Sequence, residues 1–130
     1  MKTIIKNGTL INADKMWKAD LLIDGEKIVR IEPFLEDHEA NVIDAEGMLV
    51  MPGGVDPHVH LALPMFGTIS SDDYYTGGKA AAFGGTTTVI DFVSLENDSL
   101  SQSLTKHRAK ADPQVSIDYG AHMNITHFSE

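Results

Sequence analysis

The residues of this chain best suited to chemistry are two histidines one residue apart, His58 and His60, in the run from Pro52 to Leu61. On a β-strand, residues two apart point to the same face, and a rise of about 3.3 Å per residue sets their Cβ atoms roughly 6.5–7 Å apart. Two imidazoles at that spacing can converge on one metal ion, each nitrogen about 2.0–2.1 Å from it. A solvated surface pair is the alternative, because two ligands alone do not complete a site. We predict that His58 and His60 are metal ligands.

Polar residues near this pair, and the other histidines, have more ordinary interpretations. Asp56 could orient an imidazole as an outer carboxylate, or form a turn before Pro57, and we favour the turn. Asp91, at the end of a later candidate strand, is expected to be a buried, hydrogen-bonded carboxylate. The remaining histidines singled out are expected to be satisfied or solvated side chains: His107, His122 and His127.

The loop that follows the histidines, residues 61–67, contains no charged residue. An apolar loop beside a metal site can form a wall against an apolar substituent of a substrate. Ordinary packing beneath a loop is the equally weighted alternative.

A strand must end at the histidine pair, and the sequence after Pro52-Gly53-Gly54 provides one. Candidate strands at 55–61, 86–93 and 115–125 alternate with candidate helices at 70–83 and 99–111. This β-α-β-α-β order predicts parallel strands joined by right-handed crossovers. The unit could fold alone with helices on both faces of its sheet, or it could open an eightfold barrel of about 250 residues. Barrel active sites lie at the carboxyl ends of strands, where the pair falls.

The two candidate helices carry specific expectations. Ser70 and Asp73 have the spacing of a capping box for the first helix, and Gly84-Gly85 supplies its end. The pair Gly77-Gly78 weakens that helix, because each glycine costs about 1 kcal/mol relative to alanine. In the second helix one face carries three apolar residues: Leu100, Leu104 and Ala111.

The first fifty residues predict short strands and tight turns. Asn7-Gly8 predicts a type I′ hairpin between strands at 3–6 and 9–12. Asp24-Gly25-Glu26 predicts another hairpin between strands at 19–23 and 27–31. Short candidate strands follow at 41–43 and 48–51. This part is expected to form part of an antiparallel sheet or sandwich.

Composition limits the classes of partner. The 130 residues carry ten Lys plus Arg against nineteen Asp plus Glu, a net charge of −9, which disfavours nucleic acid and anionic membranes as partners. The absence of cysteine excludes a disulfide framework and a thiolate metal site. No apolar run approaches the length of a membrane span or of a signal peptide, so we expect a soluble, cytoplasmic protein.

Three sequence blocks carry a resemblance to a known family. They are IKNGT at 5–9 with the turn that follows, PGGVDPHVHLALPMFG at 52–67, and AAAFGGTTTVIDF at 80–92 with DYGAH at 118–122. On these blocks the whole chain resembles the dihydropyrimidinase and hydantoinase branch of the amidohydrolase superfamily. The second block is the most specific, because PGxxDxHxH marks the superfamily and LPMFGT narrows the branch.

The resemblance implies an α/β fold, a (β/α)8 barrel of the TIM type with a small β-sandwich domain. Residues 1–52 would be the N-terminal part of the sandwich, and residues 53–130 the first β/α units of an incomplete barrel. His58 and His60 would bind one ion of a centre of two divalent metals, usually zinc. Leu63, Met65 and Phe66 match the substrate-gating loop of the family.

The remaining machinery follows later in family chains: a carboxylated lysine that bridges the metals, two more histidines and a catalytic aspartate. No catalytic residue is therefore assigned within residues 1–130, and this N-terminal fragment alone is expected to be inactive.

The implied reaction is the hydrolytic opening of a cyclic amide, a dihydropyrimidine or a 5-substituted hydantoin, to an N-carbamoyl amino acid. Allantoinases and dihydroorotases share the superfamily motif and stay open as alternatives, although the arginine that dihydroorotases carry soon after HxH is absent from residues 61–67. An inert truncated chain is the other alternative. The resemblance also implies a homo-oligomer, commonly a tetramer, acting on a small molecule without nucleic acid or membrane.

Overall fold

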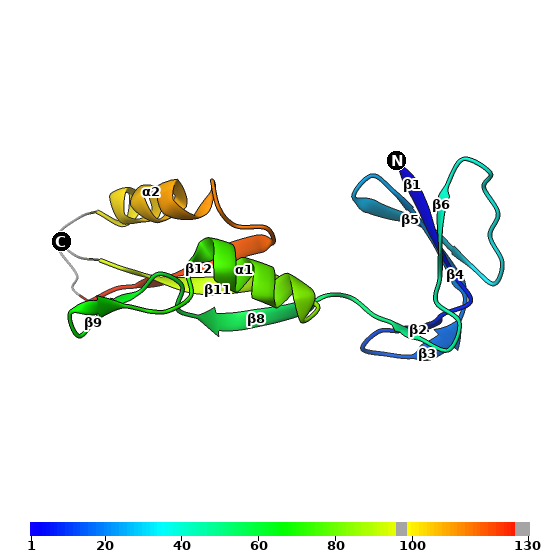
Figure 1. Cartoon of the computed structure of the whole chain (residues 1–130), viewed down its shortest axis with the longest axis horizontal. Helices are drawn as coiled ribbons and strands as arrows, with labels where there is room; N and C mark the ends of the chain where they lie inside the picture. Colours follow the sequence, from blue (N-terminus) through cyan, green and yellow to red (C-terminus); the bar gives the residue numbers. More distant parts are fainter. Residues whose placement is uncertain (96–98, 127–130) are drawn as a thin grey trace. The chain divides into compact units, whose positions relative to one another are not determined.

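The computed structural model describes residues 1–95 and 99–126, which belong to two compact units, Met1–Pro52 and Gly53–Glu130 (Figure 1). The first unit is built from strands, and the second combines a parallel sheet with two helices. Within the described ranges, no helix is long and apolar enough to cross a membrane.

The first unit contains two sheets. One has the order β5-β4-β1-β6, and the other has the order β3-β2-β7. Their bounds are β1 Lys2–Lys6, β2 Thr9–Ile11, β3 Met16–Lys18, β4 Asp20–Asp24, β5 Lys27–Glu32, β6 Asn41–Asp44 and β7 Leu49–Val50. Strands β1 and β6 pair in parallel, as do β2 and β7, so the sheets are mixed and the antiparallel expectation is wrong in part.

Only one of the two expected hairpins forms. Strands β4 and β5 pair antiparallel around Gly25, which has a φ of 59°, as predicted. The Asn7-Gly8 hairpin is wrong, because β1 and β2 lie in different sheets. Asn7 does adopt a positive φ of 63°, but its backbone N–H donates to the Asp20 carboxylate (3.0 Å). This turn therefore carries the chain from one sheet to the other.

Strand β4 joins the two apolar clusters of the first unit, because its successive side chains point to opposite faces. Leu22 packs with Ile4 and Leu35 on one face, and Leu21 packs with Leu10 and Ala19 on the other.

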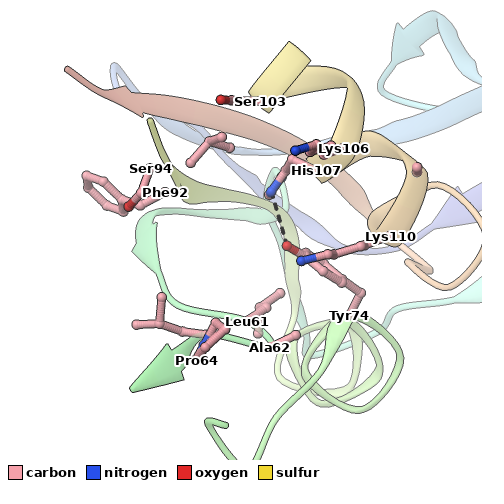
Figure 2. Close-up of a pocket in the computed structure, with 13 residues that line it drawn as sticks. Leu61, Ala62, Pro64, Tyr74, Phe92, Ser94, Ser103, Lys106, His107 and Lys110 are labelled. Carbon is pink, nitrogen blue, oxygen red and sulfur yellow. Dashed lines mark hydrogen bonds between the residues drawn. The ribbon is translucent and has the colours of Figure 1, made fainter. Parts of the chain in front are cut away.

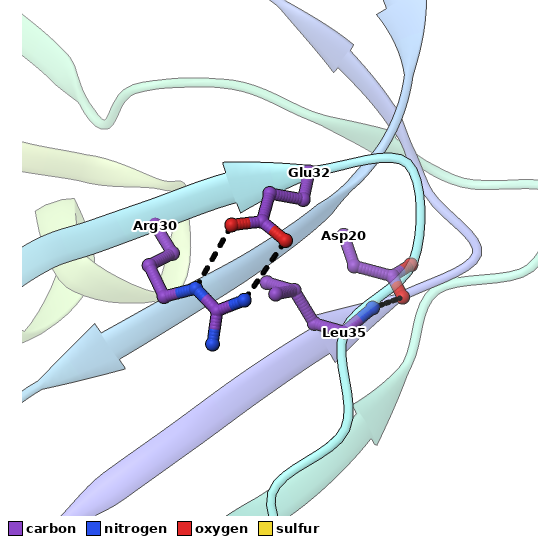
Figure 3. A network of polar contacts seen from close by, with 4 residues as sticks. All are labelled: Asp20, Arg30, Glu32 and Leu35. Carbon is purple, nitrogen blue, oxygen red and sulfur yellow. Dashed lines mark hydrogen bonds and ion pairs between the residues drawn. The ribbon is translucent and has the colours of Figure 1, made fainter.

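The carboxylate of Asp20, a residue only 4% exposed, accepts a hydrogen bond from the backbone N–H of Leu35 at 2.9 Å and so holds Leu35 beside β4 (Figure 3). Nearby, the Arg30 guanidinium makes two hydrogen bonds to Glu32, of 3.0 and 2.8 Å, on the exposed side of β5.

The second unit confirms the predicted β-α-β-α-β order. Its parallel sheet has the order β12-β11-β8. The elements are β8 Gly54–Val59, β9 Pro64–Met65, β10 Thr68–Ile69, α1 Tyr74–Phe83, β11 Thr86–Ser94, α2 Leu100–Ala111 and β12 Asp118–Asn124. Both helices cover the same face of the sheet (Figure 1), and Tyr74 of α1 contacts His107 of α2 there. The arrangement with helices on both faces is therefore excluded.

Helix α1 begins later than predicted. Its capping box is formed by Asp73 and Thr76, with Asp73 Oδ1 2.7 Å from the Thr76 backbone N, so the assignment of Ser70 to this role is wrong. The end at Gly84-Gly85 is confirmed, since Gly84 is the C-cap. Gly77 allows close packing: a Cβ atom there would lie 2.5 Å from Leu61 Cδ2. The glycine that weakens the helix therefore brings it against the segment after the histidines.

The buried face of α2 differs from the apolar face expected. Its buried residues are Ser103, His107 and Ala111, whereas Leu100 and Leu104 are 48% and 38% exposed. His107 turns inward because the hydroxyl of buried Tyr74 lies opposite it and is the hydrogen-bond partner of its Nδ1.

Candidate metal centre

Strand β8, which carries His58 and ends one residue before His60, contains a β-bulge. Its register against β11 runs from Asp56 opposite Val89 to Val59 opposite Asp91, so β8 has one extra residue at this point. The sequence explains the bulge, because Pro57 has no N–H to give to the ladder. The N–H of the next residue, His58, donates to Asp56 Oδ1 at 3.0 Å. Asp56 thus has the turn role that we favoured.

The two imidazoles lie close together directly after the bulge. The Nε2 atoms of His58 and His60 are 3.2 Å apart, with ring centroids at 5.1 Å and an interplanar angle of 80°. Two nitrogens bound tetrahedrally to one ion at 2.0–2.1 Å lie about 3.3 Å apart. Both side chains are exposed. In the absence of metal, a single shared hydrogen bond between the rings accounts for the same spacing. The spacing of the two Nε2 atoms thus suits binding to one common ion as well as a shared hydrogen bond.

The pair is not joined by further ligands within this chain. No group of three or more His, Asp or Glu side chains suited to a metal ion occurs in residues 1–95 and 99–126. Asp91 and His122, to which no ligand role was assigned, bind other groups: Asp91 accepts the Tyr74 hydroxyl, and His122 binds a backbone carbonyl. His127 lies outside the described residues.

An aromatic ring lies under the histidines. The Phe92 ring on β11 is 4.5 Å from the ring of His58 and 5.2 Å from that of His60, measured between centroids. On its other side it is 5.0 Å from the ring of His122, its register partner on β12. Sequence reasoning did not single out Phe92. The alternation of β11 was a signal for its face, but the contacts depend on sheet order.

The opposite face of β11 carries a buried polar network. Asp91, 3% exposed, accepts the Tyr74 hydroxyl (2.9 Å) and the backbone N–H of Leu61 (3.4 Å). This confirms the expected buried carboxylate. Because Leu61 directly follows His60, the network fastens the backbone at the end of the histidine segment.

His107 completes the network through Tyr74, whose hydroxyl oxygen lies 3.2 Å from His107 Nδ1. The hydroxyl proton is given to Asp91, so Nδ1 must carry the hydrogen here and Nε2 is a bare acceptor in the neutral ring. Burial lowers the pKa of His107, an effect that the charge of Asp91 opposes, and so favours the neutral ring. Burial, followed by the charge of Asp91, raises the pKa of Tyr74. No short-range signal in the sequence pairs these residues.

A pocket of about 440 Å³ adjoins this network, as Figure 2 shows. Its walls include the Leu61–Pro64 segment, Tyr74 and α2, and they do not include His58 or His60. Within the described part of the chain, His107 Nε2 and Ser103 Oγ, both buried, have no hydrogen-bond partner. The pocket is thus separate from the histidine pair.

The apolar loop forms a hairpin that sequence reasoning did not predict. Strands β9 and β10 pair antiparallel, and the turn residues Phe66 and Gly67 have φ angles of 50° and 80°. Phe66 is 99% exposed and Met65 is 43% exposed. Leu63 is half-buried, and its N–H donates to Ser70 Oγ at 2.9 Å. The hairpin therefore presents apolar side chains at its tip, and Phe-Gly was the available turn signal.

Comparison with known proteins places the chain. No family model matches it. Over 100% of its length it is 44% identical to a D-hydantoinase of Geobacillus stearothermophilus and 43% identical to dihydropyrimidinase 2 of Caenorhabditis briggsae. A crystal structure of D-hydantoinase superposes on all of it with a TM-score of 0.96 at 45% identity. Along its whole length the chain is therefore similar to D-hydantoinases and dihydropyrimidinases.

The chain spans 28% of the Geobacillus D-hydantoinase, 26% of the Caenorhabditis dihydropyrimidinase and 28% of the solved D-hydantoinase chain. The histidine pair, its bulged strand and the apolar hairpin thus lie in a segment that matches about a quarter of each relative.

Proposed function

We propose that this chain contributes to a metal-dependent hydrolase that opens cyclic amides, dihydropyrimidines or 5-substituted hydantoins, to N-carbamoyl amino acids. The observation that carries the proposal is the convergence of His58 and His60 Nε2 in a chain that matches D-hydantoinases and dihydropyrimidinases along its whole length. The substrate class follows from the names of those relatives.

His58 and His60 would hold one ion of a centre of two divalent metals, with zinc as the metal of choice for imidazole ligands. When bound, such ions lower the pKa of water and make hydroxide available near neutral pH. The contribution of this chain is to orient the two nitrogens, through the bulge at Pro57 and the hydrogen bond from the His58 N–H to Asp56.

Leu63, Met65 and Phe66 would form an apolar wall of the substrate site. The exposure of Met65 and Phe66 on the hairpin supports this role, because it leaves adjacent apolar side chains available to contact an apolar group of a substrate. The absence of charge from residues 61–67 suits an uncharged ring.

The unit Gly53–Glu130 would be the opening of a (β/α)8 barrel, and residues 1–52 part of a β-sandwich domain. Sequential parallel strands with both helices on one face support the barrel, because the uncovered face then becomes its interior. The active protein would be a cytoplasmic homo-oligomer, a tetramer by analogy with its family.

Because two histidines alone do not complete a metal site, zinc titration is done on a chimera in which this chain replaces the matching segment of the Geobacillus stearothermophilus D-hydantoinase, after removal of bound metal with a chelator. We expect wild type to bind zinc and the His58→Ala/His60→Ala variant to lose that binding. His38→Ala, at an exposed histidine of the first unit, is the matched control and should bind like wild type. Equal zinc binding by wild type and the double variant would refute the proposal that His58 and His60 bind metal.

The same chimera tests the activity. The chain is 44% identical to the D-hydantoinase segment that it replaces. We expect the zinc-loaded chimera to open dihydrouracil and hydantoin, and His58→Ala to abolish the reaction. A folded, metal-loaded chimera that prefers allantoin or dihydroorotate, or that hydrolyses none of these rings, would refute the proposal.

A further inference from the structure

The bulged peptide before His58 is contacted by a side chain from β12, the strand at the opposite edge of the three-stranded sheet. His122 on β12 has its Nε2 3.1 Å from the carbonyl oxygen of Pro57 on β8. A carbonyl only accepts, so Nε2 carries the hydrogen and donates it. Strands β12 and β8 flank β11, so the contact crosses a whole strand, a span of about 9–10 Å. His122 therefore fixes the residue that immediately precedes the first histidine of the pair.

The contact passes over Phe92, which stands opposite His122 in the register of β11 and β12. The Phe92 ring also lies against both imidazoles of the pair, at the centroid distances given above. One aromatic ring thus limits the side-chain rotation of His58 and His60, while His122 limits the backbone that leads into them. Rotation of either imidazole would separate the two Nε2 atoms.

We propose that His122 and Phe92 are positioning residues for the histidine pair: His122 holds the Pro57 carbonyl and Phe92 supports the two rings, so that both Nε2 atoms face one ion. This inference rests on the proposed metal site. It assigns no ligand role to His122, because its Nε2 is occupied by Pro57.

The test measures Co²⁺ binding by the metal-free chimera with the Geobacillus stearothermophilus D-hydantoinase, from the dissociation constant and the d–d absorption spectrum of the bound ion. His122→Phe keeps an aromatic ring beside Phe92 but removes the donor. His122→Gln restores a donor. Phe92→Leu keeps apolar volume without the flat ring, and Phe92→Tyr keeps the ring. Thermal unfolding of each metal-free variant separates positioning from folding.

We expect His122→Phe and Phe92→Leu to raise the Co²⁺ dissociation constant about tenfold or more, the usual effect of losing a partner that orients a ligand. Their spectra should change, while His122→Gln and Phe92→Tyr stay near wild type and the metal-free unfolding temperatures stay close together. Should His122→Phe fail to fold, Phe92→Leu carries the same test.

Two results would overturn the inference: wild-type affinity in His122→Phe or Phe92→Leu, or equal losses in His122→Phe and His122→Gln. Failure of the proposed metal site is a different result, in which wild type and His58→Ala bind Co²⁺ alike.

Discussion

Replacing Tyr74 with phenylalanine removes one oxygen atom from the centre of the buried network and leaves the aromatic ring in place. Tyr74 is 4% exposed, and its hydroxyl donates to Asp91 and accepts from His107. A hydrogen bond to a charged acceptor contributes about 1.5–3 kcal/mol, and a buried N–H left without a partner costs about 1–3 kcal/mol. Because these contributions overlap, we expect Tyr74→Phe to lower the free energy of unfolding of the second unit by about 3 kcal/mol.

Urea unfolding can report the two units separately. Both helices lie in Gly53–Glu130, so far-ultraviolet circular dichroism follows that unit. The only tryptophan of the sequence, Trp17, lies in the first unit, and its fluorescence should not respond to Tyr74→Phe. Tyr75→Phe is the matched control, because Tyr75 is the next residue on α1 and is 53% exposed. We expect a change within about 0.5 kcal/mol for that variant.

A second variant tests the assignment of the hydrogen. In Tyr74→Phe/His107→Leu the orphaned N–H is gone, so we expect about 1 kcal/mol of stability to return relative to Tyr74→Phe. The role of the Tyr74 hydroxyl is refuted if Tyr74→Phe is no more destabilising than Tyr75→Phe. The assignment of the hydrogen is refuted if the double variant is less stable than Tyr74→Phe by as much as His107→Leu alone destabilises wild type.

Three other expectations concern pH and the two units. Burial lowers the pKa of His107 in the folded chain, so the unfolded chain takes up this proton at a higher pH than the folded chain does. The free energy of unfolding should therefore fall as the pH drops below about 6.5, by up to about 1.4 kcal/mol per pH unit. In urea titrations, His107→Leu should flatten this pH dependence. Asp73→Ala should destabilise α1 by about 1 kcal/mol in circular dichroism, whereas Asp72→Ala at a neighbouring exposed position should not; equal losses would contradict the capping box. Asp20→Ala should shift the tryptophan fluorescence transition by about 2 kcal/mol, and no shift beyond that of the exposed Asp24→Ala would contradict the role of the buried carboxylate.

Features of short range were predictable from the sequence. The turn around Gly25, the alternation of strands and helices after Pro52 and the helix end at Gly84 each depend on a few neighbouring residues. The common direction of His58 and His60 also follows from spacing alone, and their role as metal ligands stays a prediction. Backbone geometry and local turn chemistry are sufficient for these features, because each is decided within one or two elements.

Features that join distant elements were decided by the tertiary structure. The Asn7-Gly8 turn connects two sheets because Asp20, thirteen residues away, takes its N–H. Helix α2 buries His107 rather than its leucines because the Tyr74 hydroxyl, which donates to Asp91, accepts a hydrogen bond from His107. Most buried polar groups have a hydrogen-bond partner that the fold brings to them, and local periodicity in the sequence does not indicate where that partner lies.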